Sequence, residues 1–127
     1  MADYITDIID RYEAELQKVQ QDGYALQYVK EQTPELCLAA VQKNVWAIYN
    51  VKEQTPELCL SAVQQCGLSL QFVKEQTPEL CLAAVQQYGW ALDYVKEQTP
   101  EICLAAVKQC GTDCLYNWSK NKRLYFV

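Results

Sequence analysis

Four cysteines that recur along the chain are the first residues to test for chemistry. They lie 22 residues apart, at Cys37, Cys59, Cys81 and Cys103. Thiolates act as nucleophiles and metal ligands, but equivalent positions of packed helices lie about 8–10 Å apart. A disulfide requires α-carbons within roughly 7 Å, so successive members of this row should not pair. Because their sequence neighbours are apolar, we expect small hydrophobic core residues.

Three further cysteines lie outside this row, near expected turns, at Cys66, Cys110 and Cys114. Gly111 interrupts the helix between the last two, and the chain contains no histidine. A tetrahedral metal site therefore lacks ligands, and we predict incidental thiols and no bound metal. The odd total of seven cysteines, without a secretory pattern, favours reduced thiols. A redox role is the alternative, and it requires a lowered thiol pKa.

Glutamates recur in pairs four residues apart, and paired carboxylates can perform acid–base catalysis. The pairs are Glu31/Glu35, Glu53/Glu57, Glu75/Glu79 and Glu97/Glu101. Four identical pairs do not suit one active site, and the second member of each is placed to complement a helix start. The sequence shows no nucleophile–base pair and no phosphate-binding glycine loop. We therefore predict that the protein is not an enzyme, with no catalytic residues and no cofactor.

The elements that position these residues follow from an internal repeat. The segment Val-Lys-Glu-Gln-Thr-Pro-Glu begins at Val29, Val51, Val73 and Val95, a period of 22 residues. Its threonine, proline and glutamate predict a helix start. The helix should end about ten residues later at residues that tolerate left-handed geometry. These are Gly67, Gly89 and Gly111, with Asn44 as a substitute. A second, shorter helix should then run to the next Lys-Glu-Gln.

Both expected helices are amphipathic, with apolar arcs of about 200° that include Leu82 on the first helix. Arcs this wide imply burial against the partner helix and against neighbouring repeats. The predicted fold is all-α, a short α-solenoid of 22-residue helix-turn-helix repeats with atypical capping helices. We expect a single α-repeat domain over residues 1–127. It comprises an N-terminal cap and half repeat (1–28, with a charged helix over 5–20), four repeats (29–116) and a C-terminal cap or tail (117–127).

Most aromatic residues occupy two repeat positions that we expect to be buried. These are Tyr28, Phe72, Tyr94 and Tyr116 at one position, and Tyr24, Trp46 and Trp90 at the other. Tyr49 instead takes the outward position that Gln27, Gln71 and Asp93 occupy in other repeats, and Tyr88 lies at a variable turn position. Exposed aromatic residues are frequent at binding hot spots, so these five residues are candidate protein-binding positions.

The apolar tail supplies two more candidates, Tyr125 and Phe126, which follow a basic segment. We expect the tail to pack on the last repeat. The alternatives are contact with a target or formation of a homodimer through terminal faces.

Charge limits the classes of partner. Eleven basic and sixteen acidic residues give a net charge of −5, the wrong sign for a protein that neutralises phosphates, so nucleic acid is a disfavoured partner. No uninterrupted apolar run reaches the 18 or so residues of a membrane helix. The acidic amino terminus differs from a signal peptide, so we expect an intracellular, cytoplasmic location.

One motif in the repeats resembles a known family. Asp22-Gly23-x-Ala25-Leu26-x-x-Val29, followed by Thr33-Pro34-Glu35-Leu36-Cys37-Leu38-Ala39-Ala40-Val41, is similar to a domain-of-unknown-function repeat, number 4116, of giant DNA viruses of amoebae and some protists. The resemblance covers roughly residues 19–116, with local departures at Val45, Asn50, Thr112 and Asp113. It implies a viral or protist origin, and for a viral protein a place in the host cytoplasm or the virion. It carries over no catalytic residues.

We therefore expect a non-enzymatic protein-interaction module that acts on host or viral proteins, with variable turn and outward side chains selecting the partner. A self-assembling structural protein, a homodimer or larger, is the alternative. A modular nucleic-acid reader is a weaker third hypothesis: the lysine row at Lys30, Lys52, Lys74 and Lys96 could support it, but each lysine adjoins a glutamate.

Overall fold

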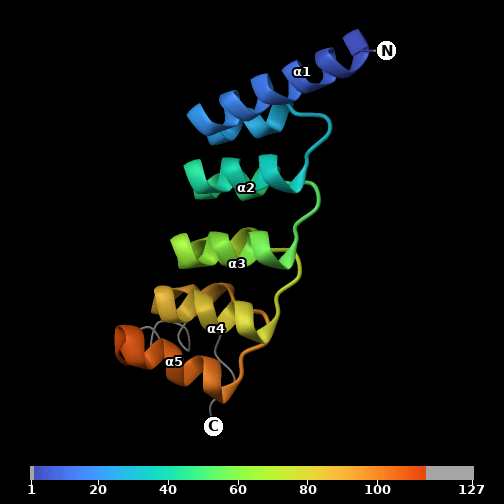
Figure 1. The fold of residues 1–127 in the computed structure, drawn as a ribbon. Coiled ribbons are helices and arrows are strands. Elements are labelled where there is room, and N and C mark those ends of the chain that lie inside the picture. The colour runs from blue at the N-terminus through green and yellow to red at the C-terminus, as the bar shows by residue number, and fades with distance from the viewer. Residues whose placement is uncertain (1, 114–127) are drawn as a thin grey trace. The chain divides into compact units, whose positions relative to one another are not determined.

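The computed structural model describes residues 2–113 (Figure 1). Contacts divide the chain into two compact units, Met1–Leu58 and Cys59–Val127. The first contains the α-helices α1 (Ala2–Gln21) and α2 (Pro34–Lys43) and the 3₁₀-helices η1 (Gly23–Tyr28) and η2 (Val45–Asn50). Helix α3 (Pro56–Gln65) crosses the boundary in sequence. The second unit continues with η3 (Gly67–Phe72), α4 (Pro78–Gln87), η4 (Gly89–Tyr94) and α5 (Pro100–Cys110).

The predicted fold class is confirmed within residues 2–113, where every regular element is helical. Each of the three repeats over residues 29–94 forms one α-helix and one 3₁₀-helix, and the described part of the fourth repeat forms α5. In the first unit α1 packs against α2 and η1, while α2 also packs against η1 and η2. In the second unit α4 packs against η3, η4 and α5. Elements thus contact their neighbours along the sequence, as in an α-solenoid. The single-domain organisation stays a prediction.

The α-helices of the repeats begin where the Thr-Pro-Glu motif predicts. The Thr33 hydroxyl oxygen accepts a hydrogen bond from the Leu36 amide at 3.2 Å, and Thr77 caps Leu80 at the same distance. Proline takes the first helical position, where its missing N–H leaves no hydrogen bond unmade. Each cap satisfies an amide that the helix itself cannot.

The helix ends differ from the prediction. Of the described glycines only Gly111 has a positive φ, 76°, so the left-handed role assigned to Gly67 and Gly89 is wrong. Both are buried, and a β-carbon on Gly67 would lie 2.5 Å from the Ala84 carbonyl oxygen. Glycine is needed there because the backbone of the next repeat approaches closely.

Asn44 also has a different role from the one predicted. Its backbone is extended, with φ −148°, and its side-chain oxygen accepts a hydrogen bond from the Trp46 amide at 3.1 Å. Asn44 therefore starts η2 rather than supplying a left-handed end to α2. Asp22 caps η1 in the same way, through the Tyr24 amide at 3.0 Å.

The core consists of one apolar set per repeat. In the first unit the largest fully buried side chains are Val19, Leu26, Leu36, Val41 and Ile48; in the second they include Val63, Leu70, Val85, Leu92 and Val95. Burying each such side chain contributes roughly 1.5–3 kcal/mol. The buried arc of the α-helices is narrower than predicted, because Leu82 is only half-buried and its repeat equivalent Leu104 is exposed.

Candidate protein-binding surface

The outward positions singled out by the sequence lie on or beside the 3₁₀-helices. Gln27, Tyr49 and Gln71 are exposed, Asp93 is half-buried, and Tyr88 is 39% exposed at the residue that precedes η4. Tyr125 and Phe126 lie outside the described residues. The first unit brings Gln27 and Tyr49 onto neighbouring elements, since η1 packs against η2.

Two further tyrosines lie exposed on η1 and were wrongly expected to be core. Tyr28 is 81% exposed and Tyr24 is 42% exposed, compared with 73% for Tyr49. We use the name tyrosine face for Tyr24, Tyr28 and Tyr49 taken together, although Tyr24 and Tyr28 lie on either side of the buried row of η1 rather than one above the other. It places three large amphipathic side chains on two packed 3₁₀-helices of the first unit.

The helical period explains why the tyrosine face was missed. A 3₁₀-helix has three residues per turn, so side chains three apart lie one above the other. The buried positions of this segment are Gly23, Leu26 and Val29, which recur every three residues. Placing residues at 100° intervals assumed an α-helix and put Tyr24 and Tyr28 in the core. The three-residue spacing of these glycine, leucine and valine positions could have revealed the exposed tyrosines.

The second unit presents a less aromatic equivalent of this surface. Tyr94 is 39% exposed, so the expectation that it is buried is also wrong, whereas Phe72 and Trp90 are half-buried. The Gln71 side chain donates a hydrogen bond to the Leu68 carbonyl oxygen at 3.1 Å. The most exposed large aromatic side chains of η1–η4 therefore belong to the first unit.

A glutamine in the connecting loop holds neighbouring 3₁₀-helices in place. The Gln32 side-chain nitrogen donates to the Asn50 carbonyl oxygen at 2.9 Å, and its oxygen accepts from the Lys52 amide at 2.9 Å. Gln76 repeats this arrangement with Tyr94 and Lys96, at 2.7 and 3.0 Å. Each glutamine ties its own loop to the end of the next 3₁₀-helix, which orients the outward side chains. Local sequence patterns give no sign of this role, because the partners of Gln32 lie 18 and 20 residues further along the chain.

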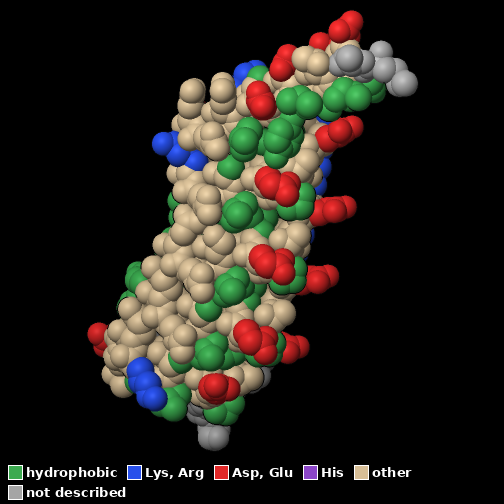
Figure 2. All heavy atoms as spheres, viewed as in Figure 1, with side chains coloured by type: hydrophobic (Ala, Val, Ile, Leu, Met, Phe, Trp, Pro, Cys, Tyr) green, Lys and Arg blue, Asp and Glu red, His purple; other side chains and the backbone are tan. Residues whose placement is uncertain are grey.

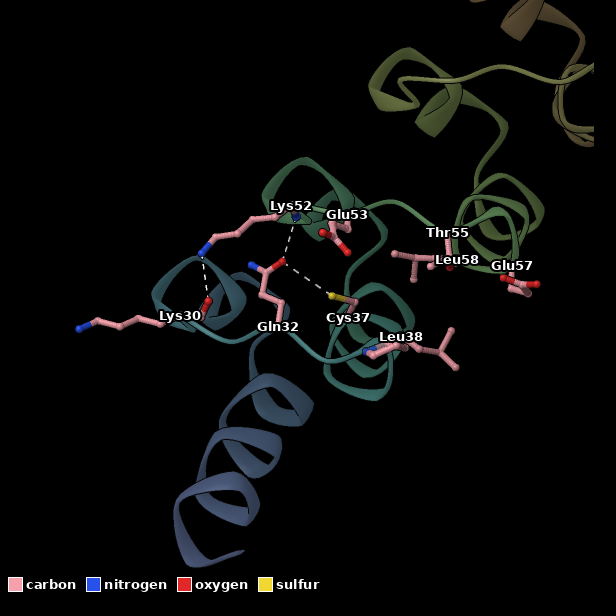
Figure 3. Close-up of a pocket in the computed structure, with 10 residues that line it drawn as sticks. Lys30, Gln32, Cys37, Leu38, Lys52, Glu53, Thr55, Glu57 and Leu58 are labelled. Carbon is pink, nitrogen blue, oxygen red and sulfur yellow. Dashed lines mark hydrogen bonds between the residues drawn. The ribbon is translucent and has the colours of Figure 1, made fainter. Parts of the chain in front are cut away.

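A cavity of about 580 Å³ lies beside Gln32 in the first unit, between two connecting loops (Figure 3). Its lining includes Lys52, whose ammonium group donates to the Lys30 carbonyl oxygen at 3.1 Å, and the exposed carboxylates of Glu53 and Glu57. The Cys37 thiol also lines it, 3.8 Å from the Gln32 side-chain oxygen. The cavity mixes both charges with apolar walls.

The four cysteines of the row are buried, as predicted. Burial raises the pKa of the Cys37, Cys59, Cys81 and Cys103 thiols, and the Glu97 carboxylate raises that of Cys81 further. A raised pKa keeps the neutral thiol, which is a poor nucleophile and metal ligand. These residues therefore pack as small apolar side chains.

The off-row cysteines differ from each other. Cys66 is a half-buried free thiol. Cys110 takes part in a disulfide, so the expectation of an incidental thiol is wrong at that position. Cys114 lies outside the described residues. Within residues 2–113 no group of three His, Cys, Asp or Glu side chains is placed to hold a metal ion.

The paired glutamates are all exposed, and acidic side chains are prominent on the surface in Figure 2. None of the eight is enclosed as a catalytic carboxylate would be. In the described part of the chain no helix has both the length and the apolar character needed to span a bilayer.

Residues 55–99 match the protein-family model described as a domain of unknown function (DUF4116). No curated protein and no solved structure matches the chain.

Proposed function

We propose that the protein, whose residues 55–99 match the DUF4116 family model, is a non-enzymatic protein-interaction module. The observation that carries the proposal is the tyrosine face, where Tyr28 and Tyr49 are 81% and 73% exposed on packed 3₁₀-helices. Tyrosine is enriched at interface hot spots because it offers a large apolar ring and a hydrogen-bonding hydroxyl.

Buried side chains and hydrogen bonds fix η1 and η2, so the tyrosine face should bind a partner without a change in backbone conformation. Leu26 and Ile48 anchor η1 and η2 in the core, each fully buried. Gln32 joins η1 and η2 through the carbonyl oxygens of Leu26 and Asn50, at 3.3 and 2.9 Å. A preorganised surface loses less conformational entropy on association than a flexible one.

Charge favours a partner with basic character. The net charge is −5, and the surface in Figure 2 shows more acidic than basic side chains. Complementary charge speeds association and rejects acidic competitors. The resemblance of the repeats to giant-virus and protist proteins extends the proposal to a viral or protist chain that binds a host or viral protein.

Affinity capture followed by measurement on the purified pair tests the proposal. The immobilised chain is exposed to a protist lysate, and the recovered partner is titrated by calorimetry against Tyr28→Ala and Tyr49→Ala. A hot-spot tyrosine should weaken binding by about 30-fold or more. Tyr94→Ala is the control, since Tyr94 is a 39% exposed tyrosine on η4, outside the tyrosine face and outside α1. A partner bound equally well by all three variants contradicts the proposed surface.

A further inference from the structure

Helix α1 is twice as long as the helix it packs against. It has 20 residues, whereas α2 has 10. At 1.5 Å per residue the extra turns amount to about 15 Å. Figure 1 shows α1 continuing past the end of α2 in the first unit. The amino-terminal half of α1 therefore has no helix of this unit beneath it.

One apolar stripe runs along the whole of α1, but only its second half is covered. Val19 is fully buried and Leu16 and Tyr12 are half-buried. The first half of the stripe consists of side chains that are 40% to 72% exposed: Tyr4, Ile5, Ile8 and Ile9. Figure 2 shows hydrophobic side chains on the surface over α1. A stripe of this spacing on an isolated surface helix is typical of a helix that docks on a partner.

The charged residues beside this stripe indicate which partner fits. At 100° per residue, Asp7 and Arg11 lie one turn apart on the same border of the stripe. Asp3 and Asp10 lie on the opposite side of the helix. When two identical helices pair antiparallel, the stripe border of one helix lies beside the same border of the other. Asp7 of each copy therefore faces Arg11 of the other copy.

We propose that α1 pairs antiparallel with α1 of a second copy of this chain. Centred between Ile8 and Ile9, the pair packs these residues against each other and places Arg11 within one residue of the level of the second copy's Asp7. The twofold axis makes this ion pair twice. The contact is isologous, so it closes at a dimer and leaves no free end. The pairing does not depend on the tyrosine face, which lies on η1 and η2.

The contact is small, so the dimer should be weak and reversible. Four large apolar side chains per copy lie well below a standard interface of about 800 Å² per partner. We expect a dissociation constant of about 10–100 μM. Sedimentation velocity of the whole chain over a concentration range that spans this value measures it.

Charge-reversal variants distinguish the antiparallel α1 pairing from other contacts between two copies of the chain. Asp7→Arg and Arg11→Asp should each raise the dissociation constant about tenfold, because each reversal acts at two ion pairs. The double variant restores opposite charges and should return the constant to within about threefold of the original. Asp10→Arg is the matched control, with the same change of charge on the far side of α1, and should leave the dimer unchanged.

Ile8→Asp removes the apolar centre and should give a monomer, with circular dichroism reporting whether the chain is still folded. The charge-reversal variants decide the question even if this variant unfolds. A chain that is monomeric at every concentration overturns the proposal. So does a dimer that survives Ile8→Asp, or a double variant that stays as weak as the single ones.

Discussion

Removing the Gln32 side chain should destabilise the protein by an amount that follows from its hydrogen bonds. Its nitrogen donates to the Leu26 and Asn50 carbonyl oxygens, at 3.3 and 2.9 Å, and its oxygen accepts from the Lys52 amide at 2.9 Å. Each such bond contributes about 0.5–1.5 kcal/mol net. Because the Gln32 side chain is only half-buried, we expect Gln32→Ala to lower the free energy of unfolding by about 2–3 kcal/mol, below the upper end of the summed range.

Gln98, a second equivalent of Gln32 in the second unit, provides a control of the same chemical type. The Gln98 side chain donates to the Leu92 and Val95 carbonyl oxygens at 3.1 and 3.5 Å, and its buried oxygen has no hydrogen-bond partner among the described residues. Gln98→Ala removes an unsatisfied acceptor together with these two long bonds, so its cost should stay below about 1 kcal/mol.

Urea denaturation of both variants, followed by circular dichroism, measures the difference. Gln32→Glu adds a third comparison, because a carboxylate keeps the acceptor for the Lys52 amide but loses both donated bonds and faces two carbonyl oxygens. It should be at least as destabilised as Gln32→Ala at neutral pH. Equal costs for Gln32→Ala and Gln98→Ala would refute the role given to the loop glutamines.

Five other results are expected. Tyr49→Ala should change the free energy of unfolding by no more than about 0.5 kcal/mol in urea, because the side chain is 73% exposed; a larger loss would make it structural. Gly67→Ala should cost about 1–3 kcal/mol in the same assay, because the new β-carbon would lie 2.5 Å from a carbonyl oxygen; an unchanged midpoint would contradict the close approach. The half-buried Cys66 should react with a thiol reagent before the buried Cys81. Burial raises the pKa of the Cys81 thiol. The neutral thiol should therefore contribute fully to stability below the ordinary thiol pKa of about 8.5, and this contribution should be lost as the pH rises above that value. Cys81→Ala should not show this pH dependence. With a net charge of −5, the chain should not retard single-stranded RNA in a low-salt gel, and a clear shift would revive the nucleic-acid hypothesis.

Local sequence signals were sufficient to predict the repeat and the starts of its α-helices. The 22-residue period and the Thr-Pro-Glu motif predict α-helix starts that the structure shows at Pro34, Pro78 and Pro100. The burial of the cysteine row also follows from sequence, because each cysteine lies among apolar residues on a helix that must pack on its neighbours. These features depend on residues close together in the chain.

Which side chains are exposed depends on contacts between repeats, and local sequence patterns do not contain that information. The short segments η1 to η4 are 3₁₀-helices, so the period of three in η1 exposes Tyr24 and Tyr28, which an α-helical period would bury. The glycines serve close approach between repeats rather than left-handed turns. The sequence by itself determined that identical units stack, because each unit carries more apolar surface than it can bury alone. Only the tertiary structure decided which aromatic side chains stay exposed and where α1 runs beyond its support, because both depend on how far the neighbouring repeat extends.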